Sequence, residues 1–381
     1  MGFKLRDTEA LKGTLYSEHA DKGISMARLP KIILAVLLMV GLTVVLNLTG
    51  QENHIGEFAI GGVAPPGESD ERPRTPERRK LAKPAEVEAT PEVFIQPTDE
   101  ERLAAVGNLQ QLREEWWPFF QPHETTLPIP VPQDGDWLAE HPQSHQSFDL
   151  FLKQRPNRPN RERGTMYLLP LDEFDEYVPQ LEDLRDFMQR YFGMPTKVLP
   201  RHTFPPQRVT ERNNPHTKNL QWLTSDVLRE LKPLLPPDAF CMLGVTMTDL
   251  YPDPKWNFVF GQATFTDRVG IYSFARFDTT FWGNERSPAG RLEMLRRSCH
   301  LIAHETGHMF GIRHCVYYQC VMNGCNSQAE SDTQPLRACP VCLRKLQWSI
   351  NFDPAQRERE LTEVYERLGM TDRPLREVGQ E

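Results

Sequence analysis

The sequence predicts an α+β domain built around one long helix whose C-terminal end is rich in histidine and cysteine. Amphipathic helical patterns, with apolar residues three and four positions apart, recur along the second half of the chain. Between and after them come short runs rich in β-branched and aromatic residues, which is the composition of buried strands. Helices and strands therefore mix along the chain.

The composition limits what kind of protein this is. The chain has 381 residues with 33 prolines and 25% charged residues, so part of it is not packed into a core. Its 39% of hydrophobic residues nevertheless suffices for one core of moderate size and excludes a wholly disordered chain. A net charge of -8 argues against nucleic acid as a partner, because nucleic-acid-binding proteins usually carry a basic face.

An uninterrupted run of apolar and small residues extends from Ile32 to Leu46. We predict a transmembrane anchor over residues 32–48, since the run is just short of the ~20 residues that a spanning helix prefers. Basic residues precede this run and none follows until Arg72, so residues 1–31 are predicted to form a cytoplasmic tail. The chain is then a single-pass membrane protein whose remainder lies outside the cytoplasm. The alternatives are a cleaved signal peptide, which would make the protein secreted, and a buried core helix.

Residues 49–97 are predicted to form a disordered, proline-rich linker. This stretch holds seven prolines and scattered charges, with almost no aromatic residue to build a core. The folded domain is predicted to occupy residues 98–375. It begins at Thr98, where the sequence T-D-E-E has the spacing of a helix capping box, and apolar residues at helical intervals extend this first helix to Trp117.

The same patterns predict the later elements. A helix over residues 179–192 is expected to end at Gly193, because glycine readily takes the left-handed conformation that stops a helix. Two more helices are predicted over residues 225–234 and 291–310, and three strands over residues 240–247, 256–260 and 269–277.

The last of these helices carries an H-E-x-x-H motif, which places His304 and His308 one turn apart on one face. Glu305 can reach a metal-bound water without itself occupying a coordination position. Gly311 and His314 extend the motif to H-E-x-x-H-x-x-G-x-x-H, in which the glycine turns the chain and returns a third imidazole to the same ion. Three histidines leave one tetrahedral position for water, which is the ligand set of a catalytic zinc site.

Five of the seven cysteines fall within residues 315–342, a clustering typical of a metal site. Cys315 and Cys320 form one pair, and after eighteen intervening residues Cys339 and Cys342 form a C-x-x-C pair. Two such pairs on short loops suit a tetrahedral four-cysteine zinc site. Two disulfides are the alternative, and Cys325 is either a spare thiol or a substitute ligand.

These motifs resemble the archaemetzincins, a family of zinc metallopeptidases in the metzincin clan. The resemblance covers residues 99–373 and leaves the first hundred residues outside it. It rests most firmly on HETGHMFGIRHC at 304–315, on the C-x4-C-x-M run that ends at 322, and on CPVCLRKLQW at 339–348. Looser similarities occur in GDWLAEHPQSHQSFDLFL at 135–152, MPTKVLP at 194–200 and RVGIYSFARF at 268–277.

The resemblance implies a zincin-like (metzincin) catalytic domain with a small mixed β-sheet, an active-site helix and a methionine turn at Met322. It also implies two zinc ions per chain and a role for each ligand. Glu305 would be the general base, His304, His308 and His314 would bind the catalytic zinc, and Cys315, Cys320, Cys339 and Cys342 would bind the structural zinc. In such a fold an edge strand receives the extended substrate, and residues 269–277 are our candidate for it, with a central core strand as the alternative.

The function predicted from these motifs is hydrolysis of peptide bonds in a peptide or protein substrate. Zinc lowers the pKa of a bound water, and Glu305 removes its proton as the water attacks the scissile carbonyl. The alternative is a non-catalytic, zinc-stabilised peptide-binding or interaction module tethered to a membrane through the N-terminal helix. The presence of Glu305 favours the enzyme, since a degenerate site could lose the one residue that binds no metal.

Overall fold

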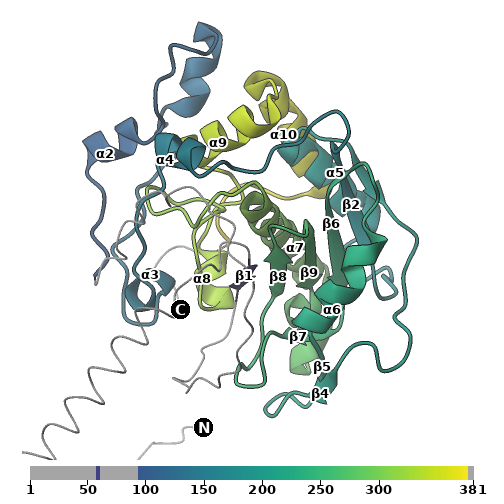
Figure 1. The fold of residues 1–381 in the computed structure, drawn as a ribbon. Helices are drawn as coiled ribbons and strands as arrows, with labels where there is room; N and C mark the ends of the chain where they lie inside the picture. The colour runs from purple at the N-terminus through teal and green to yellow at the C-terminus, as the bar shows by residue number, and fades with distance from the viewer. Residues whose placement is uncertain (1–56, 61–92, 376–381) are drawn as a thin grey trace, which may run out of the picture. The chain divides into compact units, whose positions relative to one another are not determined.

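The computed structural model describes residues 57–60 and 93–375 of the chain (Figure 1). The predicted cytoplasmic tail (1–31) and transmembrane anchor (32–48) lie outside these residues, as does most of the predicted linker. Among the helices of the described ranges, none combines the length and the apolar character that a membrane crossing requires.

The elements follow one another in a mixed order. The strands are β1 (Glu57–Ile60), β2 (Thr165–Pro170), β3 (Thr196–Val198), β4 (Glu211–Asn213), β5 (Leu220–Leu223), β6 (Ala239–Thr246), β7 (Asp249–Tyr251), β8 (Gly261–Thr264) and β9 (Val269–Ser273). The α-helices are α2 (Asp99–Ala104), α3 (Trp137–Glu140), α4 (Phe148–Lys153), α5 (Leu181–Phe192), α6 (Thr224–Leu231), α7 (Pro288–Met309), α8 (Gln328–Asp332), α9 (Pro340–Ile350) and α10 (Pro354–Leu368). Short 3-10 helices are η1 (Glu114–Phe120), η2 (Lys232–Leu234), η3 (Ala275–Phe277) and η4 (Thr279–Trp282).

A six-stranded mixed sheet forms the centre of the domain, in the order β1-β8-β9-β6-β2-β3. The pairs β2/β3, β2/β6 and β6/β9 are parallel, whereas β8 runs antiparallel to both β9 and β1. A second sheet of three short strands has the order β4-β5-β7. The predicted α+β class with a mixed sheet is confirmed.

Helices cover both faces of the six-stranded sheet (Figure 1). Successive side chains of a strand point to opposite faces, and β2 shows this alternation. Met166 and Leu168 join the larger core, which also contains apolar residues of α5, α7 and α9. Tyr167 and Leu169 join a second core together with apolar residues of α6. Both faces of the sheet are therefore buried, and α7 lies within the larger core.

Several predicted elements occur where the sequence places them. The helix predicted over residues 179–192 is α5, and Gly193 ends it in the left-handed conformation with φ 62°. Helix α7 matches the prediction for residues 291–310, with Ser287 as N-cap and Pro288 in its first turn, both favourable at a helix start. Strand β6 matches the run over residues 240–247, and α6 followed by η2 matches the helix over residues 225–234.

Two predicted elements differ from the structure. Thr98 does form a capping box with Glu101, but α2 ends at Ala104 instead of continuing to Trp117. Gly107 takes φ +77°, which is not a helical conformation, so the helix cannot continue through it. A Cβ there would lie 2.8 Å from the Phe148 ring, so the backbone passes close to α4 at this glycine. Residues 256–260 are not a strand: they form a loop whose one bridge pairs Val259 with Leu250, and β8 begins directly after them.

The prediction that residues 269–277 form the edge strand is wrong, and the central-strand alternative is correct. Strand β9 lies between β6 and β8, and all five of its residues are buried. A chain reversal after β8 returns β9 to the interior of the sheet and leaves β8 further out. In turn β8 pairs with β1, from Glu57 opposite Thr264 to Ile60 opposite Gly261. This strand lies within the range predicted as linker.

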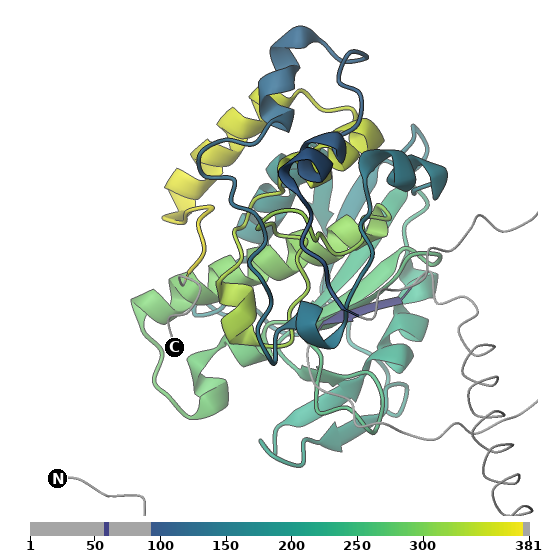
Figure 2. The same ribbon diagram turned by 90° about the vertical axis from the view of Figure 1, so that its left-hand side faces the viewer.

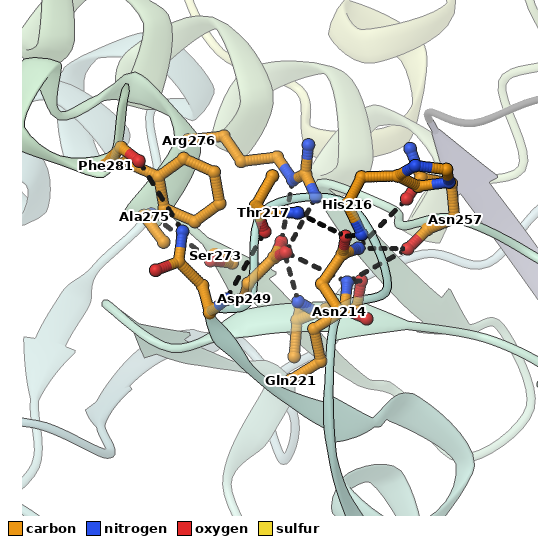
Figure 3. A network of polar contacts seen from close by, with 12 residues as sticks. Asn214, His216, Thr217, Gln221, Asp249, Asn257, Ser273, Ala275, Arg276 and Phe281 are labelled. Atoms are coloured by element: carbon orange, nitrogen blue, oxygen red, sulfur yellow. Dashed lines mark hydrogen bonds and ion pairs between the residues drawn. The ribbon is translucent and has the colours of Figure 1, made fainter. Parts of the chain in front are cut away.

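A buried ion pair joins the small sheet to the end of β9. The guanidinium of Arg276 donates two hydrogen bonds of 2.8 Å to the carboxylate of Asp249 in β7. Gln221 in β5 donates a third bond of 2.9 Å to the same carboxylate, and Figure 3 shows both donors converging on it. Arg276 also stacks 3.6 Å from the centre of the Phe258 ring. This network fixes the segment that connects β9 to α7.

Replacement of Asp249 by asparagine should lower the free energy of unfolding by about 3 kcal/mol. The substitution leaves the Arg276 guanidinium buried without its counter-ion, which is the costly way to break a buried pair. Urea unfolding of the two proteins measures the difference. Glu182→Gln, which removes an exposed partner of Arg185, is the control and should change stability little. Equal stabilities of the Asp249→Asn variant and the parent would contradict this account.

Candidate metal centres

The last turns of α7 bring two imidazoles together. The Nε2 atoms of His304 and His308 are 2.9 Å apart, because residues four apart lie on one helix face. The Nδ1 atom of His304 lies 2.7 Å from the Val321 carbonyl oxygen, and that of His308 lies 2.6 Å from the Ile312 carbonyl oxygen. A carbonyl only accepts, so each Nδ1 carries the proton and each Nε2 keeps a lone pair for a metal.

A chain reversal after α7 returns the third histidine. Gly311 takes φ +83° and donates its N–H to the His308 carbonyl at 2.8 Å. The ring of His314 then lies 5.3 Å from that of His304 and 4.9 Å from that of His308, centre to centre. One ring nitrogen of each histidine lies within 4.8 Å of the other two. The structure thus brings all three predicted ligands to one point.

The electrostatic surroundings keep these imidazoles neutral. Burial lowers the pKa of His304 to about 4. Burial and the neighbouring His304 lower the pKa values of His308 and His314 well below the ordinary value. Neutral imidazole is the form that binds a metal ion, so the donor set fits a zinc site.

Glu305 is fully buried, and burial raises its pKa well above the ordinary value. Neither of its carboxylate oxygens has a hydrogen-bond partner among the described residues. Buried polar atoms are almost always paired, so an orphaned carboxylate indicates a water, ion or substrate group that completes the site. The Glu305 carboxylate can therefore accept hydrogen bonds from a water or a substrate group.

Met322 packs against α7 at Gly307. A Cβ on Gly307, between the two helical histidines, would collide with the Sδ atom of Met322. The Met322 carbonyl also accepts a hydrogen bond of 2.6 Å from the backbone N–H of Cys315. The methionine turn suggested by the resemblance is thus in contact with the histidine-bearing helix.

The four predicted cysteine ligands also meet. Cys315 and Cys320 lie in the loop after α7, Cys339 is the N-cap of α9, and Cys342 is in its first turn. All four are buried, and their Sγ atoms lie within 4.8 Å of one another. Hydrogen bonds from the other three thiols hold the pKa of Cys315 well below its usual range. A thiolate among buried thiols is the donor chemistry of a structural zinc site.

The remaining cysteines stay apart from this cluster. All seven cysteines are free thiols, so the disulfide alternative does not occur in the structure. Cys325 lines a small cavity with Phe260, Phe277 and His300, where burial raises the pKa of its thiol. It is therefore not a member of the four-cysteine group. His300 is buried one turn before His304 and packs in the same cavity.

Residues from a distant segment complete the surroundings of His314, and sequence reasoning missed them. The Trp137 ring meets that of His314 edge-on, with 5.1 Å between centres, and the side chain of Gln143 also contacts this histidine. The only signal for this contact is the looser family similarity at 135–152. Tyr317 and Tyr318, close to the motif in sequence, are buried beside the cysteines instead, which raises their pKa values.

Similar sequences and a similar structure occur among known proteins. Residues 205–348 match Peptidase family M54. The chain is 36% identical to archaemetzincin-2 of Macaca fascicularis over 274 residues, which cover 64% of this chain and 75% of that protein. It is 36% identical to archaemetzincin-2 of Mus musculus over 273 residues, covering 64% and 76%. A crystal structure of archaemetzincin from Methanopyrus kandleri is 25% identical with a TM-score of 0.38, covering 51% of this chain and 99% of that one.

Replacement of Gly307 by alanine should destabilise the protein by about 1–3 kcal/mol, because the added methyl group overpacks the contact with Met322. Thermal unfolding measures the effect. Gly290→Ala, in the first turn of the same helix, is the control: a Cβ there would lie 3.3 Å from Ser287 Oγ and Thr279 Cγ2, so its cost should stay well below that of Gly307→Ala. If Gly307→Ala costs as much in a Met322→Ala background as in the parent, the collision is not the cause.

Proposed function

Because this chain belongs to the archaemetzincin family of zinc metallopeptidases, we propose that it hydrolyses peptide bonds at the three-histidine centre, with Glu305 as the general base. The observation that carries this proposal is the buried carboxylate of Glu305, which has no partner in the described part of the chain and is next in sequence to the first of three converging imidazoles. A non-catalytic binding module would have no use for that carboxylate.

The residues of the histidine centre have different roles in the proposed reaction. The carbonyl partners of His304 and His308 fix both rings with Nε2 toward the centre, which pre-organises the site. A zinc ion held there would supply Lewis acidity, lowering the pKa of water and polarising the scissile carbonyl. Glu305 takes the proton of the attacking water as the new C–O bond forms, and it passes that proton to the amine as the C–N bond breaks.

A second zinc ion is proposed at the four cysteines, giving two per chain. Between α7 and α9 the chain has little regular structure apart from the five-residue helix α8, so this region needs a cross-link. The buried ammonium of Lys345 favours the thiolate of Cys315 by charge, which offsets part of the negative charge of such a site. We assign the cysteine centre a structural role and the histidine centre the catalytic one.

The role of the N-terminal segment is a separate proposal. We propose that residues 32–48 anchor the protein as a single pass, with the catalytic domain outside the cytoplasm, or else direct its secretion. The run from Ile32 to Leu46 and the basic residues before it support this placement. The full chain should stay with the membrane fraction after alkaline extraction, and its release into the supernatant would contradict an anchor.

Glu305→Gln should reduce peptide hydrolysis by roughly 10²- to 10⁴-fold and leave zinc binding intact, since the residue moves a proton but is not a ligand. Mass spectrometry of a mixed peptide library, with metal analysis alongside, measures both properties. Glu293→Gln, an exposed glutamate on the same helix, is the matched control and should cut like the parent. Undiminished cleavage by Glu305→Gln would rule out the proposed base.

Metal analysis should find about two zinc ions per chain in the parent, one in His308→Ala and one in Cys342→Ser, since each substitution removes one ligand set. The cysteine variant should also unfold at a distinctly lower temperature, because a structural zinc contributes directly to folding. A single zinc in the parent that survives His308→Ala would show that the histidine centre does not hold the ion.

A further inference from the structure

The third histidine differs from the other two in what holds it. His304 and His308 each have a backbone carbonyl as the partner of Nδ1. His314 instead has the side chain of Gln143, whose Nε2 lies 3.2 Å from its Nδ1. This partner comes from a segment 171 residues earlier in the chain. The orientation of one metal ligand therefore depends on a distant side chain.

Gln146, three residues further along the same segment, holds the loop that carries His314. It is buried, and its Nε2 donates to the Gly311 carbonyl at 3.0 Å. Its Oε1 accepts from the backbone N–H of Arg313 at 2.9 Å. The Gln146 amide thus hydrogen-bonds both Gly311, where the chain turns, and Arg313, which directly precedes His314.

The same amide also contacts α9, the helix next to the cysteine centre. The Oε1 atom of Gln146 accepts a hydrogen bond of 3.0 Å from Lys345, three residues after Cys342 on α9. Its Nε2 donates a further bond of 2.7 Å to Gln154 at the end of α4. Gln146 therefore links the turn after α7 with the helix that carries two of the four cysteines.

Contacts with other parts of the chain hold residues 137–148 independently of the loop that carries His314. The backbone N–H of Trp137 donates to the Glu330 carboxylate at 2.9 Å, and the Ser147 side chain caps α4 by accepting from the backbone N–H of Leu150. The N–H of Phe148 donates to the Ala105 carbonyl at 2.8 Å. This part of the chain, coloured blue, lies on the same side of the molecule as the yellow-green loops after α7 (Figures 1 and 2). It can therefore act as a rigid support.

We propose that Gln143 and Gln146 are positioning residues for the third histidine ligand. A histidine that binds metal through Nε2 carries its proton on Nδ1, and a half-turn of the Gln143 amide presents Oε1 to accept it. Gln146 meanwhile sets the path of the loop from Gly311 to His314. The inference rests on the proposed zinc site, because the ligand that is positioned belongs to it.

The decisive variant is Gln143→Met, which keeps the length of the side chain and removes the acceptor. In the full chain, its zinc affinity at the histidine centre should fall about 10- to 100-fold, as is usual for partners of metal ligands. Competition with a zinc chelator measures the affinity, and the visible spectrum of the Co²⁺-loaded protein should change in its nitrogen-ligand bands. The thiolate bands of the cysteine centre should not change.

Gln143→Glu is the rescue variant, since a carboxylate also accepts the Nδ1 proton, and its zinc affinity should stay near that of the parent. Gln133→Met is the matched control, an exposed glutamine earlier in the same segment, and should behave like the parent. Gln146→Met leaves Lys345 without its acceptor and is expected to destabilise the fold, so Gln143 carries the test.

Parental affinity in Gln143→Met would overturn the inference. Equal losses in Gln143→Met and Gln143→Glu would overturn it too, because they would show that packing and not an acceptor matters. Zinc and Co²⁺ binding are measured without hydrolysis. If the parent binds zinc in the expected way but cuts no peptide, the proposed function fails while the positioning role stands.

Discussion

Gathering two buried imidazoles and one half-buried imidazole at one point, next in sequence to a buried carboxylate, is the constraint on which the rest of this structure depends. Each of these groups loses its hydration, and each must find a partner or stay neutral. The imidazoles meet this requirement through neutral forms and through partners on Nδ1, which come from the turn after α7, from Val321 and from Gln143. The carboxylate is left unpaired among the described residues, so its desolvation cost stays uncompensated at the group proposed to act.

The histidine and cysteine centres are not independent features of the fold. His314 and Cys315 are neighbours in sequence and face different centres, so a shift of this dipeptide moves a ligand of both. Asn323 strengthens the connection, since its amide donates to the Cys315 carbonyl at 2.7 Å and to the Tyr318 carbonyl at 3.0 Å. The cysteine centre thus lies where it can fix the loop geometry that the histidine centre needs.

The parts of the fold that local patterns determine could be predicted from the sequence. Helices α5 and α7 carry clear periodicity and explicit end signals, and the histidine and cysteine spacings specify both centres within residues 304–342. Strand order could not be predicted, because β9 is apolar whether it lies at an edge or in the centre. Only the pairing of β8, a short and unremarkable segment, decides between these positions.

Contacts between distant segments escaped prediction for a similar reason. Gln143 and Gln146 are ordinary polar residues in a loop, and nothing in their own surroundings in the sequence indicates burial against residues 311–314. The early end of α2 likewise depends on Gly107 passing close to Phe148, some forty residues later. Such contacts are set by tertiary packing, which overrides local propensity.

The pairing of β1 with β8 has a consequence for any polypeptide that approaches this side of the sheet. A strand edge offers a single row of free N–H and C=O groups, and here Glu57–Ile60 already uses that row along β8. An incoming extended chain can pair with this edge of β8 only if it displaces β1. The effective concentration of β1 is set by the connecting chain and does not fall on dilution. Access to this edge is therefore decided by a competition between β1 and the incoming chain.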